Sequence, residues 1–390
     1  MNMHDITQAT LASSWWDHLW FRGFKGDSNF ADGTDALFFF IFWVSTFFFV
    51  VLMGLMVYFA IKYRRRPGVP IEVSPSHNTK LELLWSIIPS ILFAVMFFWG
   101  LEEYLKTRIA PIDSEIIHVT AQQWAWIWEY DGPNGPVNSA QRTMIADADS
   151  PVFALPVGRP VKFIMTSTDV IHSMYIAAFR IKRDVFPNRY STLWVEAQKI
   201  THQYEGEGPN LQLVALEPEG ERMYLSCTEY CGDQHSQMWA EIVVLSDPDY
   251  RKWIEQQGDT SGMRLPELGE LVRVQQGCNA CHSVDGSPST GPTWQGVWGT
   301  TRNFTDGGSA IMDLNYIRES IIDPKLHILE GFPDQMVSYA GRLGEREIRA
   351  IASYMRTLSG DQTEIDAANE DADQELEERE AAKADAEAGA

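Results

Sequence analysis

The longest uncharged stretch restricts the fold of this chain more than any other feature. Leu37–Ile61 is a run of 25 positions without Asp, Glu, Lys or Arg. A helix of that length rises about 37 Å, enough to cross a ~30 Å hydrocarbon core with some tilt. A second uncharged run, Leu83–Leu101, contains Pro89, which membrane helices tolerate better than soluble ones. Two buried core helices are the alternative, but soluble helices rarely lack a polar face for so long. We expect a two-helix transmembrane hairpin over residues 37–105.

The charges around the two runs predict their orientation. The loop between them carries five cationic residues against Glu72 and Glu82. Residues 1–36 carry two cationic residues and five aspartates, and no signal peptide is evident there. The positive-inside rule then places the loop in the cytoplasm and both termini outside. Residues 1–36 are accordingly expected to form an extracytoplasmic N-terminal segment.

The net charge of −22 argues against a nucleic-acid-binding protein, which needs a basic face for phosphates. Residues 361–390 hold 12 acidic and 2 basic residues, no aromatic residue and two branched aliphatic residues. A segment of this composition cannot bury a core, so we expect a disordered acidic tail with at most transient helix. The tail either steers a basic partner or only solubilises the chain.

The region between the membrane segments and the tail divides into two parts. Residues 106–258 contain short β-rich runs separated by Gly/Pro/Asn turns, and we expect alternating burial in Val161–Met165 and Ile242–Leu245. This pattern predicts an all-β sandwich or barrel. Residues 259–360 show helical periodicity, which predicts a small all-α domain. Its expected helices are 265–276, 314–322 and 345–358.

A cluster of sulfur and nitrogen ligands lies in the β region. Cys227, Cys231, His235 and Met238 fall within twelve residues, and His172 lies upstream on a predicted strand. Soft sulfur and nitrogen ligands favour copper, or zinc when the site is tetrahedral. Two Cys, two His and one Met exceed by one the set that a mononuclear blue copper site uses, which favours a dinuclear centre. A zinc site, or a core cysteine pair with incidental His and Met, is the alternative.

The second cysteine pair forms a different motif. Cys278-Asn-Ala-Cys281-His282 is C-x-x-C-H, the attachment sequence of haem c. A redox C-x-x-C or half of a zinc site is the alternative, but no other cysteine pair remains for zinc. A distal Met ligand is expected for an electron carrier. We assign it to Met336, with Met312 and Met355 as the other candidates. His118, His202 and His327 are interpreted as surface imidazoles.

Four segments resemble subunit II of the haem-copper cytochrome c oxidases. They are the two ligand-bearing stretches Asp169–Asp184 and Cys227–Met238, the aromatic run Gln123–Tyr130, and Glu82–Pro89. The resemblance covers about residues 30–250. It implies a cupredoxin Greek-key barrel, anchored by the hairpin in a bacterial plasma membrane. The segment Lys199–Arg222 is longer than the turn that this family leads us to expect.

The same resemblance implies roles for particular residues. The CuA ligands would be the five side chains named above and the backbone carbonyl of Glu229. The Glu229 carboxylate would face a Mg²⁺ ion at the boundary with subunit I. Trp124 would be the aromatic residue through which electrons enter. Glu82 would lie at the mouth of a proton pathway into subunit I.

Residues 265–358 resemble the small bacterial cytochromes c, with Met336 in the methionine loop and the Pro292 carbonyl as acceptor for the His282 ring. Together the resemblances predict subunit II of a caa-type oxidase. It would accept electrons at haem c from an external donor and pass them through CuA to subunit I, where oxygen is reduced and protons are translocated. Subunit III is a further expected partner. A membrane-anchored haem c/copper carrier without an oxidase is the alternative. A quinol-oxidase subunit lacks these copper ligands, and nine His in all cannot supply a nitrous-oxide-reductase propeller.

Overall fold

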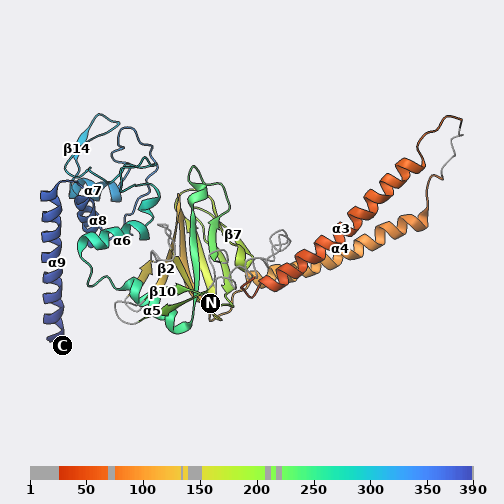
Figure 1. Ribbon diagram of the computed structural model, residues 1–390, viewed down its shortest axis with the longest axis horizontal. Helices are drawn as coiled ribbons and strands as arrows, with labels where there is room; N and C mark the ends of the chain where they lie inside the picture. Colours follow the sequence, from red (N-terminus) through yellow and green to blue (C-terminus); the bar gives the residue numbers. More distant parts are fainter. Residues whose placement is uncertain are drawn as a thin grey trace, which may run out of the picture.

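The computed structural model describes residues 26–68, 75–132, 135–138, 152–206, 212–216 and 222–388. Figure 1 shows three parts in chain order: a long helical hairpin, a two-sheet β domain and a helical C-terminal domain. Most of the predicted N-terminal segment lies outside the described residues. The predicted architecture of hairpin, β domain and small α domain is confirmed.

The hairpin consists of α3 (Ala31–Lys62) and α4 (Thr79–Arg108), and it projects away from the β domain (Figure 1). By length and hydropathy both helices can cross a membrane, and their apolar windows are not buried within the chain. Phe47 and Phe93, for example, are 62% and 69% exposed. Side chains of this kind need lipid around them. α4 continues through Pro89, as predicted.

The base of the hairpin is fastened to the β domain. The Arg180 guanidinium pairs with Asp35 near the start of α3, with a 2.7 Å Nε–Oδ1 distance. The Trp194 indole N–H donates to the Lys106 carbonyl near the end of α4 at 2.9 Å. These contacts fix the β domain close to the membrane surface.

Two five-stranded sheets form the β domain, with strand orders β3-β2-β1-β5-β8 and β4-β12-β11-β6-β7. The first contains β1 (Glu115–Gln122), β2 (Ala125–Gly132), β3 (Gly135–Asn138), β5 (Pro160–Ser167) and β8 (Ser191–Glu196). The second contains β4 (Val152–Pro156), β6 (His172–Ile176), β7 (Ile181–Val185), β11 (Met223–Cys227) and β12 (Trp239–Leu245). A hairpin of β9 (His202–Glu205) and β10 (Gln212–Ala215) occupies the long segment after Lys199. The short 3-10 turns are η1 (Ala177–Phe179) and η4 (His235–Gln237).

The sheets pack on an aromatic core. Trp128 stacks on Phe153 with ring centroids 4.5 Å apart, and Phe163 lies 4.9 Å from Trp128. The alternation predicted for β5 is confirmed, because buried and half-buried positions alternate along it. The alternation predicted for Ile242–Leu245 is wrong. β12 is buried at every position after Trp239, because it pairs with β4 and β11 and is also covered by the helix α5 and by β9.

α5 (Asp247–Gly258) leads into the C-terminal domain. The three predicted helices are confirmed within one residue as α6 (Leu265–Gln275), α7 (Leu314–Ile322) and α8 (Glu345–Thr357). The turn η5 (Cys278–Ala280) follows α6, and β13 (Thr301–Asn303) pairs with β14 (Ser309–Ile311). α6 crosses α8 closely at Gly269. A Cβ there would lie 2.1 Å from the Ala350 carbonyl oxygen.

The prediction of a disordered acidic tail is wrong. Residues Gln362–Ala388 form the helix α9, which runs along the outside of the C-terminal domain (Figure 1). Ala368 and Ala372, one turn apart, are buried against it. Acidic residues of α9 pair with three arginines of the domain, in Arg264–Asp373, Arg346–Glu375 and Arg356–Glu364. Small apolar residues and ion pairs therefore hold α9 on the domain, although the helix lacks the large apolar side chains whose absence predicted disorder.

Candidate copper and haem sites

The ends of three neighbouring strands bring the sulfur and nitrogen ligands together. Cys227 is the last residue of β11, and His172 is the first residue of the adjacent strand β6. The chain then loops back to β12, and the Cys227 backbone N–H donates to the Met238 carbonyl at 3.1 Å. Strand pairing therefore places His172 beside a loop that is 55 residues away in sequence.

All the predicted copper ligands lie in this cluster. Cys227 Sγ lies 3.8 Å from Cys231 Sγ and 3.9 Å from His172 Nδ1. Cys231 Sγ lies 3.4 Å from His235 Nδ1 and 3.8 Å from Met238 Sδ. The Glu229 carbonyl oxygen lies 3.2 Å from Cys227 Sγ. Both cysteines are free thiols. Two central sulfurs flanked by two imidazoles, a thioether and a carbonyl form a soft ligand set suited to copper.

The protonation of the two thiols fits a cation site. The hydrogen bond with Cys231 lowers the pKa of Cys227, whereas the same contact together with burial raises the pKa of Cys231. The pair thus ionises once readily and a second time only when positive charge compensates it. A bound metal ion supplies that charge and deprotonates a coordinating thiol.

Asp169 orients the His172 imidazole. Its Oδ1 lies 2.8 Å from His172 Nε2, so that Nδ1 faces the cysteines. Burial acts to lower the pKa of His172, but the hydrogen bonds with Asp169 and Cys227 outweigh it and raise the pKa. A carboxylate on the distal nitrogen is the usual partner of a metal-binding histidine. Asp169 lies three residues before His172 in the sequence, and this spacing alone does not predict its role.

The segment Gln123–Trp124 packs against the copper-ligand loop. The Gln123 side-chain amide donates to the Cys231 carbonyl at 2.7 Å, and the Trp124 indole N–H donates to the same oxygen at 3.2 Å. Gly232 adopts a φ of +119°, and a Cβ there would meet Gln123 and Trp124 atoms within about 3 Å. Trp124 is only 4% exposed. It contacts the ligand loop but is not open to solvent.

Two predicted carboxylates lie elsewhere. Glu229 is exposed on the ligand loop, next to Tyr230, which is 74% exposed. Glu82 lies in the first turn of α4, far in sequence from the copper ligands. Its Oε1 accepts the Asn78 backbone N–H at 3.0 Å, while the Asn78 side chain accepts from Leu81. Glu82 therefore forms part of the N-terminal cap of α4.

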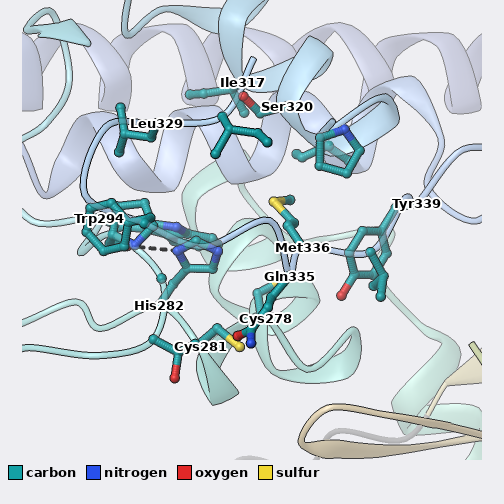
Figure 2. A pocket seen from close by; sticks show the side chains of 18 of the residues that line it. Cys278, Cys281, His282, Trp294, Ile317, Ser320, Leu329, Gln335, Met336 and Tyr339 are labelled. Atoms are coloured by element: carbon teal, nitrogen blue, oxygen red, sulfur yellow. Dashed lines mark hydrogen bonds between the residues drawn. The ribbon is translucent and has the colours of Figure 1, made fainter. Parts of the chain in front are cut away.

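The C-terminal domain contains a large cavity lined by the C-x-x-C-H motif. Figure 2 shows Cys278, Cys281, His282 and Met336 around the same space, with apolar walls that include Ile317 and Leu329. The space measures about 1350 Å³ including its open mouth. Two thiols, an imidazole and a thioether lie around this space within apolar walls, which is the set of groups that a haem c needs. Burial raises the pKa of Cys278 to about 12 and that of Cys281 to about 11, so both are neutral thiols.

His282 is held with one ring nitrogen free. Its Nδ1 lies 2.7 Å from the Pro292 carbonyl, which is the predicted hydrogen bond (Figure 2). Burial lowers the pKa of His282, so the imidazole is neutral and Nε2 is available as a ligand. Gly291 makes this arrangement possible, because a Cβ there would lie 2.8 Å from His282 Cε1. Met336 lines the same cavity, as do Met312 and Met355.

Of the three histidines interpreted as surface residues, His202 is buried and His327 is half-buried. His202 is 2% exposed beside Glu241, and burial together with the Arg222 charge lowers its pKa to about 4. His327 stacks on Phe304 at 4.6 Å and lines the haem-type cavity. His118 is exposed, as predicted. Pairing of β9 with β10 covers His202, whereas the His327 side chain keeps 34% of its surface exposed.

These geometries define a class of protein: a membrane-anchored metalloprotein with a sulfur-rich copper-type site and a separate C-x-x-C-H haem-type site. Known families match the three parts in the same order. Residues 16–102 match the transmembrane domain of cytochrome c oxidase subunit II, residues 116–211 match its periplasmic domain, and residues 267–359 match cytochrome c. The chain belongs to the cytochrome c oxidase subunit II family and carries a cytochrome c domain after the copper domain.

Individual relatives and a solved structure are similar to parts of this chain. The alternative cytochrome c oxidase subunit 2 of Bradyrhizobium diazoefficiens is 26% identical over 240 residues, covering 57% of this chain and 79% of the relative. The cytochrome c oxidase subunit 2 of Alkalihalophilus pseudofirmus is 24% identical over 333 residues, covering 79% and 82%. The crystal structure of the periplasmic domain of subunit II from Bradyrhizobium japonicum is 24% identical, with a TM-score of 0.29, covering 38% of this chain and 96% of that one.

Proposed function

We propose that this chain is the subunit of a terminal cytochrome c oxidase that receives electrons, a caa-type subunit II. When bound, haem c would accept single electrons from an external donor and dinuclear copper would deliver them toward subunit I, the site of oxygen reduction and proton translocation. The observation that carries this proposal is the ligand cluster at Cys227 and Cys231 in the same chain as the cavity at Cys278–His282. Each fits one single-electron cofactor and neither offers an oxygen-reducing site.

The residues of the chain would hold these groups as follows. Cys278 and Cys281 would attach the porphyrin covalently, with His282 and Met336 as axial ligands. The copper ions would be held by His172, Cys227, Cys231, His235, Met238 and the Glu229 carbonyl. Histidine–methionine ligation raises the potential of a haem and leaves no open position for oxygen.

The exposed part of the ligand loop supports an association with subunit I. Glu229 and Tyr230 are exposed beside the buried ligands, on a face that a partner would cover. The Glu229 carboxylate would share a Mg²⁺ ion with subunit I there. Glu82 would serve the proton pathway at the cytoplasmic end of α4, and Trp124 would take part in electron transfer into the ligand loop that it contacts. The cationic loop after Lys62 supports a plasma-membrane orientation with both metal domains outside. Subunit III would complete the complex.

Metal analysis of the full chain in detergent tests the proposal. We expect two coppers per haem, with an electron paramagnetic resonance (EPR) spectrum of one unpaired electron shared by two copper nuclei. Cys227→Ser should lose the copper signal and keep the haem, whereas Cys278→Ser should weaken haem attachment and keep the copper. Zinc in place of copper, or one copper without the shared spectrum, would contradict the dinuclear assignment. Isolation from its native membrane without any oxidase subunit would favour a free-standing electron carrier.

A further inference from the structure

We propose that Gln122 and Gln123 form a joint that fixes the cytochrome domain against the copper-ligand loop, with Gln123 as the positioning residue between the two sites. The inference rests on the proposed function and deepens it by identifying where the haem and copper domains are coupled. It shifts the coupling role from Trp124 to its neighbour in sequence.

Gln122 is the centre of a buried polar cluster between the domains. It is the last residue of β1 and 2% exposed. Its Nε2 donates to the Gln276 carbonyl and to the Tyr339 hydroxyl, each at 2.9 Å, and Arg342 donates to its Oε1 at 3.2 Å. Tyr339 and Arg342 also bind Gln276, at 2.8 and 3.1 Å. A barrel side chain thus satisfies three groups of the cytochrome domain, which fixes one docking geometry.

The backbones approach closely at the same place. Gly277, just before the haem-attachment motif, has a φ of +71°. A Cβ on it would lie 2.5 Å from the Ala125 Cβ and 3.1 Å from Gln122 Nε2. Only glycine lets the turn before Cys278 lie directly on the barrel. Nearby, Gln234 of the ligand loop donates to Thr290 at 2.9 Å, so the joint has a second contact point.

Gln123 contacts the frames of both sites. Its carbonyl oxygen lies 4.0 Å from Cys281 Sγ, on the haem side. Its side-chain amide donates to the carbonyl of the copper ligand Cys231 at 2.7 Å. Its backbone N–H donates to Asp169, which in turn holds His172, at 2.6 Å. One residue therefore connects a haem-attachment cysteine to two ligand-bearing segments of the copper site.

Trp124 does not offer such a connection to an external donor. Its side chain is 4% exposed, and the cytochrome domain docks on the two residues before it. Transfer between the sites moves one electron from haem to copper, with no bond made or broken. The task of the protein is then to keep the two frames in fixed contact, which the joint does.

The test uses the full chain in detergent, with and without its cofactors. Gln122→Ala and Arg342→Ala open the joint, and Gln123→Ala removes only the amide bridge to Cys231. Gln203→Ala and Arg318→Ala are the matched controls, since Gln203 bonds Glu205 on the barrel surface and Arg318 pairs with Glu345 on the cytochrome surface. Two quantities are measured: amide hydrogen exchange at residues 121–125 and 276–282, and the haem-to-copper transfer rate after flash reduction of the haem.

Opening the joint should raise exchange on both faces by about tenfold, because unpaired buried polar groups cost about 1.4 kcal/mol. Transfer should be slower than in both control variants. Gln123→Ala should slow transfer while exchange at residues 276–282 stays at the control value. Joint variants that match the controls in both quantities would overturn the proposal. If Gln122→Ala does not fold, Arg342→Gln makes the same comparison. A wild-type chain without copper or haem would contradict the proposed function, while exchange in the cofactor-free chain still decides whether the joint exists.

Discussion

Replacing Gly269 by alanine tests the helix crossing that builds the haem-type cavity. Gly269 lies in α6 where α8 crosses it, and Ala350 opposite is fully buried. The added Cβ would lie 2.1 Å from the Ala350 carbonyl oxygen, 2.5 Å from its carbonyl carbon and 2.8 Å from the Tyr354 Cβ. Two of these atoms are backbone, so no side-chain rotation can relieve the contact, and the helices must move apart.

The loss of unfolding free energy in Gly269→Ala follows from this geometry. Overpacking of a core costs about 1–3 kcal/mol, and a backbone clash this close belongs at the upper end, about 3 kcal/mol. For a domain of about 100 residues this corresponds to a fall in Tm of roughly 12–24 °C. Ile351 and Met355 of α8 line the cavity, so separation of the helices should also loosen the hold on haem.

The measurement is thermal unfolding of the full chain, followed by the haem absorption band, which reports on the cytochrome domain alone. Gly262→Ala is the matched control, because a Cβ at Gly262 has no atom within 4 Å and its φ is not positive. It should leave Tm within about 2–4 °C, the shift for 0.5 kcal/mol. Equal Tm values for the two variants would refute the proposed close crossing of α6 and α8.

Three further outcomes are expected. Asp169→Asn should weaken copper binding by about 10–100-fold in a competition titration, because the partner that orients His172 is altered; unchanged affinity would contradict this role. Removal of residues 362–390 should lower the Tm of the haem domain by roughly 4–8 °C, about 1 kcal/mol, with a smaller effect at high salt; no change would mean that α9 does not pack in solution. Unfolding of the barrel should become easier as pH falls from 6.5 toward 4, since the depressed pKa of His202 means that the unfolded chain binds the proton first. His202→Gln should flatten that part of the stability curve, and an unchanged slope would contradict it.

The ligands of both sites could be predicted because most of them are local in sequence. Cys227–Met238 and Cys278–His282 are short motifs whose chemistry depends on residue type and spacing. His172 was predicted as an upstream imidazole on an expected strand, and strand pairing explains why it belongs to the cluster. Met336 was chosen over Met312 and Met355, and the structure places all three around the cavity. Ligands that lie on one loop can therefore be predicted from the local sequence, whereas a ligand on a distant strand is brought to the site by the fold.

The tail shows where composition misleads. Its acidic residues and lack of large apolar side chains indicated disorder. The helix α9 nevertheless packs through Ala368 and Ala372. Its acidic side chains pair with Arg264, which directly precedes α6, and with Arg346 and Arg356 of α8. Whether an acidic helix finds basic partners depends on the surface of another element. Composition counted along the chain contains no such information.

The joint between the domains could not be predicted from the sequence either. Gln122 and Tyr339 are 217 residues apart and belong to different domains, and glutamine carries no motif. Such a pair becomes visible only when both folds are placed against one another. The same holds for Gly277, whose need for glycine comes from the barrel residue Ala125 rather than from its own loop.

Fusion of a cytochrome domain to the copper domain changes what the contact surface has to do. Separate partners meet through complementary charges, which speed encounter and weaken as salt rises. A tethered partner is already present at a high effective concentration, so steering adds little. The contact can then be small and held mainly by uncharged hydrogen bonds, as it is around Gln122 and Gln123. Charge-guided docking is then needed only on the outer surface of the cytochrome domain, where an external donor must bind.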